Sequence, residues 1–291
     1  MRSALFVPGD SERKMAKGLE SGADCLFVDL EDSVADSRKP VAREMTRAFV
    51  ADARKRATRP LLYVRCNALD TGLTDLDLDG VMAAQPDGIL LPKPRGGIDV
   101  QHLAAKLAVR EADHGIADGA TKIICVATET AAAVFGLPTY SGSSRRLVAL
   151  TWGAEDLSAD LGAETNRLPD GTLAPPYALA RTLTLLAAVA AGVQPMDSVY
   201  PNFRDEAGFR AECEAARRDG YTSKMAIHPA QVPVINEVFT VPAAEIAQAK
   251  KVVAAFAAQP DAGVVSIDGE MYDKPHLARA QKLLKRAGTV T

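Results

Sequence analysis

The sequence lacks several patterns that define common protein classes. It has four cysteines and four histidines in 291 residues, with no CxxC pair and no spacing typical of zinc ligands. The formal net charge is −3, and no lysine or arginine cluster is interleaved with aromatic residues. Nucleic acid is therefore not an expected partner. No glycine-rich segment resembles a phosphate-binding loop or a dinucleotide fingerprint.

Long hydrophobic runs are absent as well. No apolar segment approaches the roughly 20 residues that are needed to cross a bilayer, so no membrane partner is expected. The apolar segment between Ser3 and Pro8 is too short for a signal-peptide core and predicts a strand. We therefore expect a cytoplasmic protein whose cysteines are reduced core residues. These cysteines are Cys25, Cys66, Cys125 and Cys213.

Short apolar runs separated by long helical segments dominate the chain. Hydrophobic residues make up 47% and charged residues 24%, which is ordinary for a globular enzyme with a large core. Runs of this length predict buried parallel strands. The predicted strands are Ala4–Val7, Cys25–Leu30, Leu61–Arg65, Gly88–Leu91, Lys122–Ala127, Leu147–Thr151, Ser198–Tyr200 and Ser223–Ile227. Alternation of these strands with helices predicts an α/β fold of the (β/α)₈ TIM-barrel type.

Helices are predicted between the strands and beyond the last one. Ser11 is expected to cap a helix that runs to Ser21, and Pro40 fits the first turn of a helix that reaches Ala57. Further helices are predicted at Leu76–Ala84, Val100–Ala117, Pro175–Ala191 and Glu206–Asp219.

The last part of the chain lies beyond the eight predicted strand–helix units. We expect a barrel domain over residues 1–240 and a C-terminal extension over residues 241–291. The extension has predicted helices at Ala243–Ala258 and Pro275–Arg286 and an irregular piece that includes Val264–Ile267. About 50 residues bury little core alone, so the extension is interpreted as a helical appendage rather than a second domain.

Two carboxylates follow neighbouring predicted strands. Glu129 comes after the fifth strand and Asp156 after the sixth. Adjacent strands lie about 4.8 Å apart, so both side chains can converge on one cation above the barrel. An all-oxygen pair without histidine or cysteine suits Mg²⁺. The alternative is that Glu129 starts a helix and Asp156 caps Leu157–Leu161, each stabilised by a helix dipole.

Other charged residues at strand ends have two interpretations each. Arg65 ends the third strand, where its planar fork fits an anion or enolate, or it forms a surface ion pair with an aspartate. Lys93 lies between two prolines and suits either a Schiff base or a structural turn. Glu31 and Asp32 either bind water around a metal or pair with Arg65 or Lys93. His228 is interpreted as a packed strand-end histidine in preference to a base.

Seven motifs resemble those of the citrate lyase beta subunit family. They are Arg2–Gly9, Asp29–Val34, Val64–Asn67, Leu91–Lys93, Thr128–Thr130, Trp152–Leu157 and Lys224–Gln231. They occur in the family's order, and one local departure is Cys66, where the family more often has valine or isoleucine. The family contains malyl-CoA lyases, citramalyl-CoA lyases and malyl-CoA thioesterases, which are Mg²⁺-dependent barrel aldolases that act on CoA thioesters.

The resemblance implies roles for individual residues. It implies that Glu129 and Asp156 bind Mg²⁺ and that Arg65 steadies the enolate or the substrate carbonyl. It also implies that amides near the sixth strand hold the carboxylate of a 2-oxoacid and that basic residues of the first helix meet CoA phosphates. The substrate-binding residues implied in this way are Arg65, Glu129, Gly153, Ala154, Glu155, Arg13 and Lys17.

The C-terminal extension also carries a resemblance. Gly269–Asp273 resembles the stretch that, in free-standing family members, supplies a catalytic aspartate to a neighbouring subunit. The resemblance implies that Asp273 is catalytic and that the extension is a lid in a homo-oligomer, a trimer or a dimer of trimers. The implied function is Mg²⁺-dependent cleavage of a 3-hydroxyacyl-CoA thioester into an acyl-CoA and a 2-oxoacid. Open alternatives are a malyl-CoA thioesterase, a citrate lyase beta subunit that acts within a complex, and a binding protein without turnover.

Overall fold

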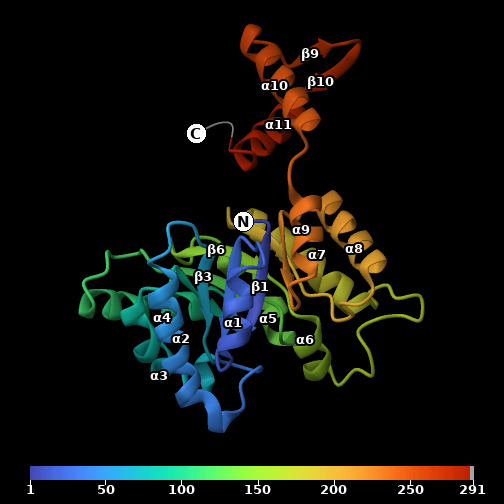
Figure 1. Cartoon of the computed structure of the whole chain (residues 1–291). Coiled ribbons are helices and arrows are strands. Elements are labelled where there is room, and N and C mark those ends of the chain that lie inside the picture. Colours follow the sequence, from blue (N-terminus) through green and yellow to red (C-terminus); the bar gives the residue numbers. More distant parts are fainter. Residues whose placement is uncertain (289–291) are drawn as a thin grey trace. The chain divides into compact units, whose positions relative to one another are not determined.

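The computed structural model describes residues 1–288, which divide into two compact units, Met1–Val238 and a second one that begins at Phe239. In the first unit eight parallel strands close into a barrel, and β8 pairs with β1 (Figure 1). The strands are β1 (Ser3–Pro8), β2 (Cys25–Asp29), β3 (Leu61–Arg65), β4 (Gly88–Leu91), β5 (Lys122–Val126), β6 (Leu147–Thr151), β7 (Gln194–Asp197) and β8 (Ser223–Ala226). The predicted (β/α)₈ barrel is confirmed.

Each barrel strand is followed by one or more helices (Figure 1). They are α1 (Glu12–Leu19), α2 (Lys39–Ala53), α3 (Thr74–Val81), α4 (Gly97–Asp113), α5 (Ala131–Gly136), α6 (Ala154–Leu161), α7 (Pro175–Ala190), α8 (Glu206–Asp219) and α9 (Gln231–Phe239). Short 3₁₀ helices occur at Asp36–Arg38, Leu69–Thr71, Met82–Ala84 and Leu137–Tyr140. Within residues 1–288, no helix combines the length and apolar character needed to cross a membrane.

The barrel interior is filled by side chains from alternate strand positions. Phe27 packs edge-on against Phe6 at 5.1 Å and against Tyr63 at 6.2 Å between ring centroids. Gly88 makes room for Tyr63, because a Cβ at this glycine would lie 2.1 Å from the tyrosine ring. The strand register places Pro8 beside Asp29 and Asp29 beside Arg65, so polar strand ends meet at one rim of the barrel.

Two local predictions are wrong. The seventh strand covers Gln194–Asp197 instead of Ser198–Tyr200, because Pro195 can serve a strand through its carbonyl, which accepts a hydrogen bond from the Thr222 amide at 3.2 Å. Ser11 occupies the N-cap position of α1, but its side chain makes no capping hydrogen bond. Pro40 lies in the first turn of α2, as predicted.

The four cysteines are free and buried, as expected. Burial raises the pKa of the Cys25, Cys66 and Cys125 thiols, and it raises the pKa of Cys213 to about 12. These thiols therefore remain protonated core groups at neutral pH.

The second unit has its own small core. It consists of α10 (Ala243–Ala258), β9 (Val264–Ile267), β10 (Glu270–Asp273) and α11 (Lys274–Arg286). The expectation of an irregular piece is wrong, because β9 and β10 form an antiparallel hairpin. Asp268 and Gly269 turn between the strands with φ of 52° and 85°, which suits a two-residue turn of the Asp-Gly type. Its core residues are Ala249, Val252, Phe256, Val265, Ala280 and Leu284.

Candidate active site

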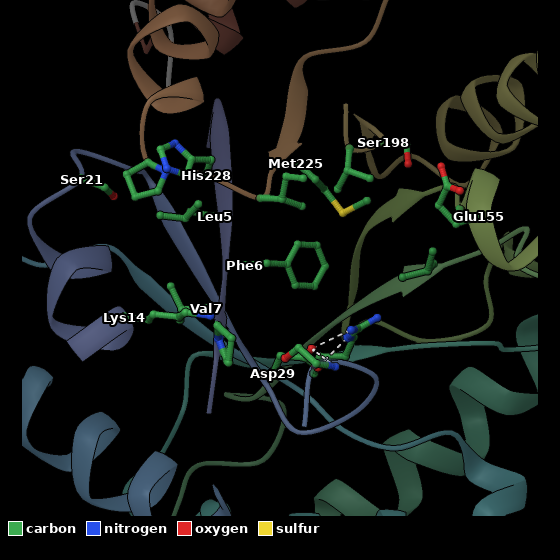
Figure 2. Close-up of a pocket in the computed structure, with 18 of the residues that line it drawn as sticks. Leu5, Phe6, Val7, Lys14, Ser21, Asp29, Glu155, Ser198, Met225 and His228 are labelled. Atoms are coloured by element: carbon green, nitrogen blue, oxygen red, sulfur yellow. Dashed lines mark hydrogen bonds and ion pairs between the residues drawn. The ribbon is translucent and has the colours of Figure 1, made fainter. Parts of the chain in front are cut away.

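A cavity of about 810 Å³ lies at the carboxyl ends of the barrel strands. Figure 2 shows Phe6 projecting into it, with Asp29, Glu155 and His228 on different sides. All the residues that line it belong to the first unit. Of the predicted site residues, the cavity brings together Arg13, Lys17, Arg65, Glu129, Gly153, Ala154, Glu155 and Asp156.

Glu129 and Asp156 line the cavity in different surroundings. Glu129 is 3% exposed, whereas the Asp156 side chain is 34% exposed in the first turn of α6. Burial, and then the charge of Asp156, raises the pKa of Glu129 well above its usual value. Gly153 makes room for Glu129, because a Cβ at this glycine would lie 2.7 Å from Glu129 Cγ. Glu129 does not start a helix, since α5 begins at Ala131 after the Thr130 cap.

These two carboxylates fit a hard divalent cation. A carboxyl whose pKa is raised by burial and a like charge gains most from a positive ion beside it. No cluster of three or more His, Cys, Asp and Glu side chains suited to a metal occurs among residues 1–288. Two protein oxygens leave the other positions to water and substrate, as Mg²⁺ prefers. Glu129 and Asp156 would hold the ion.

Arg65 forms an ion pair with an aspartate, but this pair is buried, whereas the alternative interpretation was a surface ion pair. Its Nε and Nη2 atoms each donate to Asp29 at 2.7 Å, and Nη1 lies 2.9 Å from Glu31 Oε2. The guanidinium carbon lies 5.1 Å from the centre of the Phe6 ring. Burial alone would raise the pKa of Asp29, but the bonds to Arg65 hold it below its usual value. The guanidinium is therefore fixed in place at the cavity wall.

Lys93 connects the acidic residues at this rim. Its backbone amide donates to Glu129 Oε2 at 2.5 Å, and its ammonium lies 2.7 Å from Glu31, 3.1 Å from Asp32 and 3.3 Å from Asp156. Burial alone would lower the pKa of Lys93, but the bond to Glu31 and the nearby carboxylates raise it. This opposes Schiff-base chemistry, which requires a neutral amine. Glu31 and Asp32 thus form ion pairs with Lys93, which agrees with one of the two interpretations of these residues.

The first turn of α6 borders the cavity through Gly153, Ala154 and Glu155. The first amides of a helix have no partner within the helix and suit an anion. Asn166, in the segment after α6, donates to Glu155 Oε1 at 2.9 Å. This turn is therefore a suitable place for a small carboxylate.

A buried ion network supports the start of α6. Asp197 accepts hydrogen bonds from Trp152 Nε1 at 2.7 Å, Lys224 Nζ at 2.9 Å and Arg181 Nε at 3.1 Å. Lys224 also donates to Glu212 at 2.9 Å. Because Trp152 directly precedes the turn that carries Asp156, the network fixes where that turn begins.

Sequence reasoning missed several residues of the cavity. Lys14 lines it beside Arg13 and Lys17, and its place on the same predicted helix was the available signal. Asp29 was missed as the partner of Arg65. His228 lines the cavity and stacks on Phe203 with 4.6 Å between ring centroids, in keeping with a packed histidine.

Asp273 lies in the second unit at the start of α11. It is the N-cap residue of this helix and forms a capping box with His276. Its Oδ1 atom lies 2.5 Å from His276 Nδ1, and this interaction lowers the pKa of Asp273. The carboxylate is therefore ionised at neutral pH and held at the helix end.

The fold and the cavity define a (β/α)₈-barrel protein with an acidic, arginine-containing site at the carboxyl ends of its strands. A sequence model of the HpcH/HpaI aldolase/citrate lyase family matches residues 2–229, and the chain belongs to this family.

Named relatives of this chain have two different activities. The chain is 32% identical to the citrate lyase subunit beta of Leuconostoc mesenteroides subsp. cremoris, covering 98% of this chain and 93% of that one. It is 35% identical to a (3S)-malyl-CoA thioesterase of Cereibacter sphaeroides, covering 99% and 95%. Among solved structures it resembles the protein CitE of Mycobacterium tuberculosis in complex with magnesium, acetoacetate and coenzyme A. That match has a TM-score of 0.77, 30% identity and coverage of 99% and 98%.

Proposed function

We propose that the protein is a Mg²⁺-dependent carbon–carbon lyase that acts on a 3-hydroxyacyl-CoA thioester such as malyl-CoA, citramalyl-CoA or citryl-CoA. The products are an acyl-CoA and a 2-oxoacid, and the same site can run in the direction of synthesis. The observation that carries the proposal is the meeting of Glu129, Asp156 and Arg65 in one cavity with the basic side chains of α1. The chain's family is one of aldolases and citrate lyases, which supports this reaction class.

In this reaction the role of each residue of the cavity follows from its charge. Lewis-acid polarisation of the oxoacid carbonyl is what Mg²⁺ supplies when it is bound by Glu129 and Asp156. Arg65, held by Asp29, offsets the negative charge that develops on the enolate of the acyl thioester. The amides of Gly153–Glu155 bind the oxoacid carboxylate.

The basic residues of α1 suit the nucleotide part of the substrate. Arg13 and Lys17 lie on α1 and line the same cavity as Glu129 and Asp156. Their positive charges suit the phosphates of CoA. We assign Asp273 to proton transfer at the acyl α-carbon: in synthesis its ionised carboxylate takes a proton from this carbon, and in cleavage the same carboxyl, once protonated, returns the proton to the enolate.

Thioester hydrolysis is a second candidate, because a relative that is 35% identical is named as a malyl-CoA thioesterase. Incubation of the protein with malyl-CoA and Mg²⁺ separates the two reactions. A lyase releases glyoxylate and acetyl-CoA, whereas a thioesterase releases malate and free CoA. Glu129→Gln is the control and should release neither pair. If the wild-type protein releases neither a 2-oxoacid with acetyl-CoA nor a hydroxyacid with free CoA from malyl-CoA, citramalyl-CoA and citryl-CoA, both candidates are refuted.

We also propose a homo-oligomer, a trimer or a dimer of trimers, in which the second unit acts as a lid on a neighbour's site. Glu129→Ala and Asp273→Ala should each be nearly inactive alone. When the two variants are co-assembled in equal amounts, an intact barrel meets an intact neighbouring lid at about a quarter of the sites. Activity should therefore return to that level. Verified mixed oligomers without activity would remove Asp273 from a shared site.

A further inference from the structure

One residue, Lys93, contacts both carboxylates that are assigned to the metal. Its amide donates to Glu129 Oε2 at 2.5 Å, while its ammonium lies 3.3 Å from Asp156 Oδ1. Asp156 is also the more exposed of the two, so its position depends more on such a contact. Lys93 thus joins the two carboxylates without a metal ion.

The backbone of Lys93 is held in a conformation that lysine seldom adopts. Its φ is +50°, and it lies between Pro92 and Pro94. Non-glycine residues seldom adopt this left-handed region, because the Cβ makes it strained. In this conformation both the amide and the ammonium of Lys93 meet the same acidic cluster. The strained backbone conformation is therefore found at the residue that contacts both Glu129 and Asp156.

The charges of the cluster are strongly unbalanced. Its carboxylates are Asp29, Glu31, Asp32, Glu129 and Asp156, and its cations are Arg65 and Lys93. Five negative and two positive charges give a net of −3 when all carboxyls are ionised. Arg65 is committed to Asp29 by two hydrogen bonds. Lys93 is the cation that faces Asp156.

We propose that Lys93 is a built-in counter-cation that competes with Mg²⁺ for Asp156. Without the metal its ammonium holds Asp156 in place. When Mg²⁺ binds, the ammonium withdraws to Glu31 and Asp32, which it already contacts at 2.7 and 3.1 Å. Lys93 therefore weakens Mg²⁺ binding and keeps the ion exchangeable. The inference rests on the proposed metal role of Glu129 and Asp156.

Calorimetric titration of the metal-free protein with Mg²⁺ tests this. Lys93→Met keeps the length of the side chain but removes its charge, so Mg²⁺ should bind at least about tenfold more tightly, a change of about 1.4 kcal/mol. Lys93→Arg keeps the charge and should stay within about threefold of the wild type. Lys106→Met, which removes an ammonium that pairs with Asp75 between α4 and α3, should leave the Kd unchanged.

Thermal unfolding provides a second test. Without metal, Lys93→Met should lower the Tm, and saturating Mg²⁺ should raise the Tm of this variant by more than that of the wild type. If Lys93→Met, or Lys93→Gln if the first does not fold, binds Mg²⁺ no more tightly than the wild type, the inference is overturned. If Glu129→Gln binds Mg²⁺ as well as the wild type, the metal assignment fails and the inference fails with it.

Discussion

Arg65→Lys keeps a positive charge at the cavity wall but removes the planar fork of donors. Arg65 makes two parallel bonds of 2.7 Å to Asp29 and lies 2.9 Å from Glu31, and a lysine ammonium cannot reproduce this set in one position. Loss of a bond to a buried carboxylate costs about 1–3 kcal/mol of stability. Loss of charge stabilisation at the developing enolate lowers kcat by about 10²–10³.

The assay is steady-state cleavage of the thioester that the product test identifies, with kcat and KM determined separately. KM should stay nearly constant, because the lost interaction is made mainly in the transition state. Arg43→Lys is a matched control, since Arg43 is also 12% exposed and its Nε donates to buried Asp77 at 2.7 Å. It should lose stability with a near-normal kcat. If Arg65→Lys behaves in the same way as this control, Arg65 is a structural residue.

Two further predictions concern pH and stability. Burial and the charge of Asp156 raise the pKa of Glu129, so Mg²⁺ competes with protons for this carboxyl and its Kd should weaken when the pH falls from about 8 to about 6. Calorimetry at both pH values checks this, and an equal Kd at the two contradicts it. Lys224→Met leaves buried Asp197 short of a partner and should cost about 3–5 kcal/mol in urea unfolding. Lys251→Met, in an exposed ion pair, should cost less than about 1 kcal/mol, and a similar loss in both variants would refute the reasoning.

The residues at the rim of the barrel could be predicted from the sequence because all the parallel strands end on the same side. Glu129 and Asp156 follow strands β5 and β6, and this order along the chain is enough to place both at the cavity. The partner of Arg65 could not be predicted in this way. It depends on the register that sets Asp29 beside Arg65, and two other carboxylates, Glu31 and Asp32, follow Asp29 within a few residues.

The errors in the secondary structure have different origins. The apolar pair Val199–Tyr200 predicts a strand at Ser198–Tyr200, whereas a proline such as Pro195 is uncommon inside a strand. In the folded chain the strand forms around Pro195 instead, because the Pro195 carbonyl accepts a hydrogen bond from the backbone next to the neighbouring strand. The β9–β10 hairpin had a signal in the sequence, the Asp268–Gly269 pair between Val264–Ile267 and the short apolar pair Met271–Tyr272, which sequence reasoning overlooked.

The burial of every native thiol makes this chain convenient for labelling. Because the four cysteines are buried and their pKa values are raised, they should react slowly with maleimides at neutral pH. A cysteine introduced in place of Met271 in the hairpin, which is 67% exposed, would then take a single fluorophore without removal of any native residue. Two populations that carry different dyes can be mixed, and energy transfer between them tests the proposed homo-oligomer and, if it forms, reports how fast its subunits exchange.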